Sequence, residues 1–262
     1  QGDKMNKAIF FDLDGTLIDP QSNSIPASAI EALKKLKTNG HFLAIATGRS
    51  IRSVIESNIH DVIKWDGYVC SSGQQVFLPD FTLLYGEYMD KEILTKIQDI
   101  CLKNDINAQF QCEDSFMLKE PDSAVFESHG FFNEPIPQKI KRYDDKNIEM
   151  VMVYHHDHRK FDLFKDINDI VIYPGQAPYA DVISSNNSKY HGIKAMLDHI
   201  GYDTYRYIAF GDSFNDYEMI KNATYSIAMG NAHPSIKNTA DMITRSVDQD
   251  GVYAACHRMG LL

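Results

Sequence analysis

The sequence has no long apolar run. Its longest, Ala8–Phe11 and Phe42–Ala46, fall far short of the roughly 20 residues that a membrane-spanning helix requires. No apolar segment follows the first basic residues, so we expect no signal peptide. Gln1–Lys4 has the character of a vector-derived leader ahead of a start at Met5. These absences predict a cytoplasmic protein that does not associate with a membrane.

Cysteines are few, and basic residues are outnumbered by acidic ones. The four cysteines are scattered without a Cys-x-x-Cys spacing, which argues against a zinc site and against a disulfide framework. The 262 residues include 26 lysines and arginines against 36 aspartates and glutamates, a net charge of −10. Such a chain repels nucleic acids and anionic membranes, so we expect neither as a partner. A phosphorylated ligand would need a local positive site or a metal ion.

The first third of the chain alternates short apolar runs with amphipathic segments. Lys7–Phe11, His41–Ala46 and Gly67–Cys70 have the apolar character of buried strands. Between them, apolar residues recur at helical spacing in Pro26–Asn39 and Ser50–Ile63. This alternation predicts right-handed crossovers and a doubly wound, Rossmann-like α/β core whose parallel sheet is covered on both faces.

A second, smaller α/β unit is expected after about Pro79, because the rhythm changes there. Its expected elements are Leu83–Tyr88, a helix at Asp90–Lys103, strands at Asn107–Cys112 and Met150–Tyr154, a helix at Arg159–Ile167 and a strand at Val171–Tyr173. A helix at Ser188–Ile200 and buried strands at Tyr207–Phe210 and Tyr225–Met229 then resume the first pattern. We therefore expect a core of residues 5–79 and 182–262, with a domain of about 80–181 inserted into it.

Two carboxylates, Asp12 and Asp14, directly follow the first predicted strand. Their spacing directs both to one side of an extended chain, and Gly15 permits a sharp turn afterwards. In open α/β sheets the ligand crevice lies at the carboxyl ends of strands. Adjacent carboxylates repel each other and need a cation or a shared proton, and oxygen ligands favour Mg²⁺. Taken alone, the motif fits an ordinary aspartate-containing turn equally well.

Two further strand ends carry polar groups. Thr47-Gly48-Arg49 offers a hydroxyl, backbone N–H groups and a guanidinium, which together suit an anion, although a helix N-cap would use the same residues. Gly211–Asp216 adds two acids, Asp212 and Asp216, and the amide of Asn215. Three strand ends that each deliver acidic or anion-binding groups predict one shared site.

A phosphate site in an acidic protein also needs a fixed cation. Lys189, at the start of the Ser188–Ile200 helix, is the best candidate by position. Lys194, one turn later on the same helix, competes with it.

These residues, taken in order, resemble the haloacid dehalogenase (HAD) superfamily, and in particular its Cof-type sugar-phosphatase branch. Asp12–Thr16 matches the first motif, DxDGT, and Thr47–Arg49 matches the second. Lys189 matches the third, and Gly211–Asp216 matches the fourth, GDxxND. The insertion between the second and third motifs is similar to the α/β cap of that branch.

The resemblance implies a Mg²⁺-dependent phosphatase acting on small phosphorylated metabolites, sugar phosphates first. Asp12 would be the nucleophile, forming an aspartyl-phosphate, and Asp14 the general acid and base. The metal would be held by the Asp12 side chain, the Asp14 carbonyl and Asp212, with Asn215 and Asp216 orienting its surroundings. The residues implied in phosphate binding are Leu13 and Gly48 through their N–H groups, Thr47, Arg49, Lys189 and Asn215.

Two departures from the family pattern and two other activities stay open. Ser71-Ser72-Gly73 stands where many relatives carry Asn-Gly, and Lys189 lies three residues before Gly192 instead of next to it. A phosphomutase could use the same site by returning the phosphoryl group to the sugar. A sensor could bind a phosphorylated ligand without turnover, although a pure binding site needs no acid beside the nucleophile. The sequence makes no prediction of oligomeric state.

Overall fold

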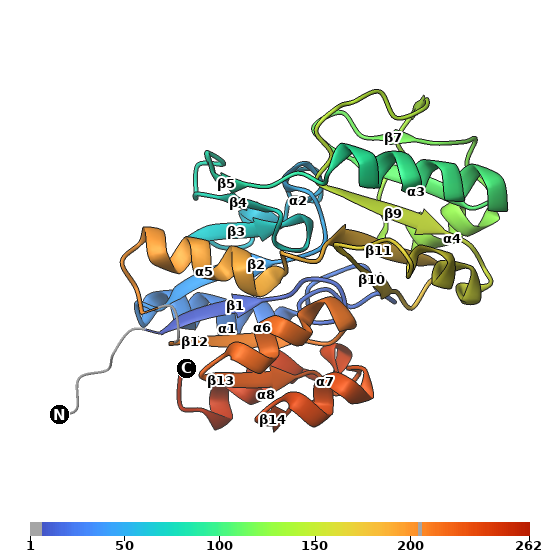
Figure 1. Ribbon diagram of the computed structural model, residues 1–262. Coiled ribbons are helices and arrows are strands. Elements are labelled where there is room, and N and C mark those ends of the chain that lie inside the picture. The colour runs from blue at the N-terminus through green and yellow to red at the C-terminus, as the bar shows by residue number, and fades with distance from the viewer. Residues whose placement is uncertain (1–6, 204–205) are drawn as a thin grey trace. The chain divides into compact units, whose positions relative to one another are not determined.

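The computed structural model describes residues 7–203 and 206–262 (Figure 1). It divides into two compact units. The core unit comprises the chain up to Tyr85 and again from Lys189 onward, and the cap unit is the contiguous segment Gly86–Ser188. No helix among the described residues combines the length and apolar character needed to cross a membrane.

The core unit is built on an eight-stranded sheet of order β14-β13-β12-β1-β2-β3-β4-β5. The strands are β1 (Ala8–Phe11), β2 (Phe42–Ala46), β3 (Gly67–Cys70), β4 (Gln75–Phe77), β5 (Leu83–Gly86), β12 (Tyr207–Gly211), β13 (Tyr225–Ala228) and β14 (Met242–Ile243). The six strands from β14 to β3 run parallel, and β4 pairs antiparallel with β3. Every residue of β1, β3 and β12 is buried, as expected of strands covered on both faces.

Helices cover this sheet as the alternating pattern predicts. They are α1 (Ala27–Thr38), α2 (Ile51–Glu56), α5 (Lys189–His199), α6 (Tyr217–Asn222), α7 (Pro234–Thr239) and α8 (Gly251–Arg258). α1 packs with α8, whereas α5 packs with α6 and against β3, so the sheet is wrapped by two helical groups (Figure 1). The predicted doubly wound α/β core is confirmed.

One core helix is shorter than the apolar spacing predicts. α2 ends at Glu56, whereas the pattern extends to Ile63. Asn58 adopts a left-handed conformation with φ 56°, which interrupts the helical hydrogen bonds. A short 3₁₀ turn at Ile59–Asp61 follows, and its Ile59 carbonyl accepts a hydrogen bond from the Trp65 indole at 3.0 Å. Ile59 and Ile63 therefore remain buried without extending the helix.

The cap unit has a six-stranded sheet of order β10-β11-β9-β6-β7-β8. Its elements are α3 (Lys91–Asn104), β6 (Asn107–Gln111), β7 (Phe116–Met117), α4 (Ser123–Phe132), β8 (Lys139–Ile140), β9 (Met150–Tyr154), a 3₁₀ helix at His158–Phe164, β10 (Ile170–Pro174) and β11 (Tyr179–Ser184). Residues alternate between the two faces of each strand. Phe110 and Val151 belong to the apolar cluster that includes α3, whereas Met150 and Met152 belong to the cluster that includes α4.

Both boundaries between the units differ from those expected from the sequence. Residue 182 lies inside β11, which pairs antiparallel with β9 and β10, so the whole strand belongs to the cap sheet. β5 belongs to the core sheet, so the core extends past residue 79 to Tyr85. The sequence-based boundary was wrong here because the short apolar run Val182–Ile183 has the character of a core strand, and its antiparallel partners are not visible in the local sequence.

Candidate functional site

The three strand ends singled out in the sequence lie at one edge of the core sheet. β1 stands between β12 and β2, all three parallel, with Phe11 level with Phe210 and Ile45. The Asp12 N–H donates to the Phe210 carbonyl at 3.0 Å, which extends the ladder by one residue. In chain order, β2 to β5 are placed on one side of β1, and β12 to β14 are placed later on its other side. The acidic residues therefore collect at the switch point of the sheet, where α/β folds bind ligands.

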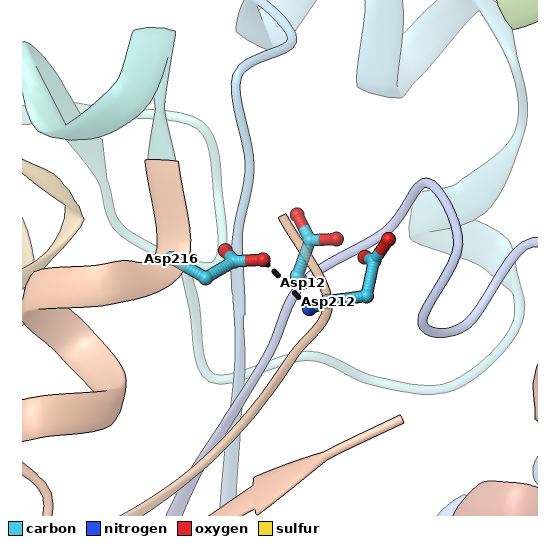
Figure 2. Close-up of side chains that lie close together, drawn as sticks. All are labelled: Asp12, Asp212 and Asp216. Carbon is cyan, nitrogen blue, oxygen red and sulfur yellow. Dashed lines mark hydrogen bonds between the residues drawn. The ribbon is translucent and has the colours of Figure 1, made fainter. Parts of the chain in front are cut away.

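A cluster of buried acidic side chains occupies this edge. Carboxylate oxygens of Asp12, Asp212 and Asp216 all lie within 4.8 Å of one another, and Figure 2 shows the three side by side. The Lys189 ammonium, fully buried at the start of α5, lies 2.6 Å from Oδ1 of Asp12 and 2.6 Å from Oδ1 of Asp216. Lys194 is exposed on the same helix. The structure thus places Lys189, and not its competitor, in the cluster.

Asp216 is fully engaged by protein donors. Its Oδ2 accepts the backbone N–H groups of Asp212 at 2.8 Å and Ser213 at 2.9 Å, and Figure 2 marks the first of these. This is a capping box, in which the Ser213 side chain in turn accepts the Asp216 N–H. With Oδ1 bonded to Lys189, Asp216 fixes the loop that carries Asp212.

Asp12 and Asp212 each keep one oxygen open. Among the described residues, no hydrogen bond engages Oδ2 of Asp12 or Oδ2 of Asp212, whereas Oδ1 of Asp212 accepts the Thr16 hydroxyl at 3.0 Å. Two open carboxylate oxygens in an all-oxygen setting suit a hard cation such as Mg²⁺. The donor set therefore fits the metal that the family pattern implies.

The charges of the cluster do not balance. Three carboxylates share one ammonium, so full ionisation leaves two excess negative charges. Burial, and then the neighbouring Asp216, raise the pKa of Asp12 from 3.8 to about 7. Burial also raises the pKa of Asp212 well above its ordinary value. Burial opposes the charge of Lys189, but Asp12 and Asp216 outweigh it and raise its pKa. A divalent cation would neutralise the excess.

The affinity for Mg²⁺ is expected to depend on pH. Because Asp12 has a pKa of about 7, a cation that binds it below that pH must displace a proton. We expect affinity to weaken by about tenfold or more per pH unit below pH 7, because the pKa of Asp212 is raised as well. Isothermal titration calorimetry in buffers of different ionisation enthalpy would measure both the affinity and the released proton. An affinity that stays constant between about pH 5.5 and 8 would contradict the raised pKa.

Arg49 and Asp14 form a tight pair within the core unit. Nε of Arg49 lies 2.8 Å from Oδ2 of Asp14, and its Nη2 lies 2.6 Å from Oδ1. The Arg49 N–H donates to the Thr47 hydroxyl oxygen at 3.1 Å. Arg49 was expected to bind the phosphate, but its guanidinium donates hydrogen bonds to Asp14 instead. The Thr47 hydroxyl can still donate its own proton to a ligand.

The remaining predicted residues occupy neighbouring positions. Asn215 is half-buried, and its Oδ1 accepts the Ser213 hydroxyl at 2.8 Å, which leaves its amide N–H groups to donate elsewhere. Leu13 and Gly48 each follow the end of a strand, and within the described part of the chain their N–H groups take part in no hydrogen bond. Such donors suit phosphoryl oxygens.

Thr16 and Asn231 support the site but were given no role from the sequence. Thr16 orients Asp212, and the Asn231 amide donates to the Gly15 carbonyl at 2.8 Å. Thr16 belongs to the motif that starts at Asp12, and a hydroxyl so close in sequence to two carboxylates could have been predicted to take part in the site. Asn231 lies 216 residues from Gly15. No local pattern connects those two positions.

Gly15→Ala is expected to disturb Asp212. Gly15 has φ +86°, and a Cβ there would lie 2.4 Å from Oδ2 of Asp212. We expect a loss of about 1–3 kcal/mol in stability from the left-handed backbone. The displaced carboxylate should lower the phosphatase activity that the family resemblance implies by roughly 10–100-fold. Gly201→Ala is the matched control, since Gly201 has φ +68° with nothing within 4 Å of an added Cβ. If both variants keep full activity, Gly15 does not position Asp212.

A sequence profile of the haloacid dehalogenase-like hydrolases matches residues 9–255. The chain belongs to the haloacid dehalogenase-like hydrolase family. The match spans all four motifs and confirms the resemblance to Cof-type members of this family.

Several relatives are similar to this chain over nearly their full length. The HAD subclass IIB sugar phosphatase BT4131 superposes with a TM-score of 0.88 at 26% identity, covering 98% of this chain and 100% of its own. YkrA of Bacillus subtilis (strain 168) is 29% identical, covering 98% of this chain and 99% of YkrA. The 5-amino-6-(5-phospho-D-ribitylamino)uracil phosphatase YitU of the same organism is 23% identical over 93% of this chain and 94% of YitU. This HAD-family chain is a hydrolase of the phosphatase type.

Proposed function

We propose that this HAD-family protein is a Mg²⁺-dependent phosphatase of small phosphorylated metabolites, with sugar phosphates as the first candidates. The observation that carries the proposal is the open carboxylate of Asp12, held by Lys189 beside Asp212. A carboxylate in this setting can attack phosphorus, and its neighbours can hold a cation. A simple phosphate-binding pocket would not place three buried acids together, because they repel the ligand.

Asp12 is the proposed nucleophile. Its carboxylate attacks phosphorus, the bond between phosphorus and the ester oxygen breaks, and an aspartyl-phosphate forms on Asp12. The departing oxygen takes its proton from the Asp14 carboxyl group. Asp14, now a carboxylate, removes a proton from the water that hydrolyses the aspartyl-phosphate, which releases inorganic phosphate and restores Asp12.

Mg²⁺ would be held by the Asp12 side chain, the Asp14 backbone carbonyl and the Asp212 side chain. When bound, it neutralises negative charge that accumulates on the phosphoryl oxygens. Asp216 keeps Asp212 in place through the bond from the Asp212 N–H to its own Oδ2. Asn215 would help to orient the surroundings of the cation.

The phosphoryl oxygens would be bound by groups that the protein leaves available. These are the N–H groups of Leu13 and Gly48, the Thr47 hydroxyl and the Asn215 amide. The Lys189 ammonium has three N–H donors, and two of them point at Asp12 and Asp216. The third is free to donate to a phosphoryl oxygen, so one side chain links the nucleophile to its target.

Substrate choice is assigned to the cap unit, residues 86–188. BT4131 is a sugar phosphatase, and YitU is a phosphatase of 5-amino-6-(5-phospho-D-ribitylamino)uracil, so relatives of this chain accept chemically different esters. The phosphate-binding groups of the core are indifferent to the leaving group, because they contact only the phosphoryl part. Residues that read the rest of the substrate must therefore come from elsewhere in the chain.

Phosphate release from a panel of phosphorylated metabolites tests the proposal. The panel would include hexose, pentose and polyol phosphates, pyridoxal phosphate and nucleotides, each with Mg²⁺ and with a chelator. We expect Mg²⁺-dependent release, fastest for sugar or polyol esters. Isomerised sugar phosphate without free phosphate would indicate a phosphomutase. Ligand binding without either product would indicate a phospho-ligand sensor and would overturn the proposal.

A further inference from the structure

The Asp14 carboxylate is bound by the side chain of Arg49. Both of its carboxylate oxygens accept hydrogen bonds from the Arg49 guanidinium, at 2.8 and 2.6 Å. The Arg49 side chain is 7% exposed and that of Asp14 is 20% exposed. A bidentate, largely buried pair of this kind holds the carboxylate plane in one orientation far better than a single contact does.

Arg49 is itself fixed through its backbone. Its N–H donates to the Thr47 hydroxyl oxygen at 3.1 Å, and its carbonyl accepts the Ser71 N–H at 2.9 Å. The Ser72 N–H donates to the Thr47 carbonyl at 3.0 Å, so the segment is tied at both ends. The base of the guanidinium is therefore held in place before any substrate binds.

The turn that ties down Arg49 is strained. Ser71 and Ser72 have φ values of 51° and 54°, in the left-handed region that residues other than glycine and asparagine rarely adopt. Such positions persist only where the surroundings require them, and they concentrate at functional sites. Here the strain keeps two N–H groups directed at the carbonyls of Thr47 and Arg49.

We propose that Arg49 is a positioning residue for Asp14, and not a ligand of the phosphoryl group. The proposal rests on the phosphatase function proposed above, in which Asp14 gives its proton to the departing oxygen as the phosphorus–oxygen bond breaks. The resulting carboxylate is the form that Arg49 binds with two hydrogen bonds. Arg49 thus orients the Asp14 side chain for both halves of the reaction, first when Asp14 protonates the departing oxygen and then when it takes a proton from the attacking water.

The test compares Arg49→Met on two esters that differ in their need for an acid. A sugar phosphate has an alkoxide leaving group that must be protonated, whereas nitrophenolate leaves p-nitrophenyl phosphate without a proton. We expect kcat/KM to fall about 100-fold for the sugar phosphate and to change less than about threefold for the aryl ester. Slow hydrolysis of the aspartyl-phosphate should also produce a burst of nitrophenolate equal to the enzyme concentration.

Two further variants complete the design. Arg49→Lys keeps the positive charge but cannot form the bidentate contact of a guanidinium with Asp14. Its kcat/KM on the sugar phosphate should therefore lie between those of Arg49→Met and the wild type. Arg52→Met removes an exposed arginine of α2, 66% exposed and paired with Glu56, and should match the wild type on both esters. Thermal unfolding of each variant confirms that the fold is intact.

The outcomes separate this proposal from the one it rests on. If Arg49→Met lowers kcat/KM equally on both esters, with a raised KM and no burst, Arg49 binds the phosphoryl group and the positioning role is wrong. If the wild type releases phosphate from neither ester with Mg²⁺, the phosphatase function itself fails.

Discussion

Asp12→Asn is expected to reduce phosphate release by about four orders of magnitude or more, with the fold intact. An amide does not attack phosphorus, so no aspartyl-phosphate can form. The substitution keeps the shape of the side chain. In the wild type the Lys189 ammonium lies 2.6 Å from Oδ1 of Asp12, and the amide oxygen of the variant can still accept this hydrogen bond. Steady-state phosphate release with Mg²⁺ measures the loss, and thermal unfolding checks the fold.

The control for Asp12→Asn is Asp61→Asn. Asp61 is an acid of the same unit whose side chain is 72% exposed, and it should leave activity unchanged. Acid quench of the wild type with a labelled substrate should trap one phosphoryl group per chain, and the Asp12 variant should trap none. Metal-dependent turnover that survives in Asp12→Asn would exclude Asp12 as the nucleophile.

Lys189→Met is expected to have the largest effect on stability. The ammonium is fully buried and pairs with two buried carboxylates at 2.6 Å. Methionine has nearly the same length but leaves Asp12, Asp212 and Asp216 without their compensating charge. Removing one partner of such a buried pair costs about 3–5 kcal/mol. Activity should fall as well, because Asp12 loses its fixed orientation. Urea unfolding with and without Mg²⁺ measures the stability loss.

Mg²⁺ should recover part of that lost stability, because a divalent cation can compensate the same carboxylates. Lys194→Met is the matched control, since Lys194 lies one turn further along α5 and is exposed. We expect it to change stability by less than about 0.5 kcal/mol. If Lys189→Met unfolds at the same urea concentration as the wild type, the cluster is not held together by this charge.

The location of the site was predictable because it follows from the order of strands. Asp12, Thr47 and Asp212 each end an apolar run, and parallel strands bring their carboxyl ends to one edge. The side-chain pairing was not predictable from this argument. Lys189 could equally have bound a ligand, and its contacts to Asp12 and Asp216 span 177 and 27 residues. The pairing of Arg49 with Asp14 depends on a rotamer that no spacing rule specifies.

The cap was harder to predict than the core. α4 (Ser123–Phe132) lies in a stretch, residues 120–147, that shows no clear apolar period. Its ends nevertheless carry ordinary signals. The Asp122 side chain accepts the N–H groups of Ala124 and Val125, and Asn133 ends the helix in a left-handed conformation. Attention to capping residues would have located this helix where periodicity alone did not.

Strand β11 shows why the domain boundary was misplaced. Tyr179–Ser184 is short, and Asp181 interrupts its apolar residues. Its identity as a cap strand comes from antiparallel pairing with Met150–Tyr154 and Ile170–Pro174, which no local pattern reveals. Long-range pairing of this kind depends on the whole sheet, so single-segment reasoning places such boundaries poorly.

The division of the core between two stretches of chain has a consequence for synthesis. Asp12 and Lys189 are 177 residues apart. Translation at about 5–20 residues per second separates them by roughly 10 to 35 s. The cap sheet is made only from residues between these two positions, so it can form while β1 still lacks its neighbour β12. During this interval the chain contains neither the Lys189 that contacts Asp12 nor the β12 strand that pairs with β1. The catalytic centre can therefore be completed only after the whole cap has been synthesised.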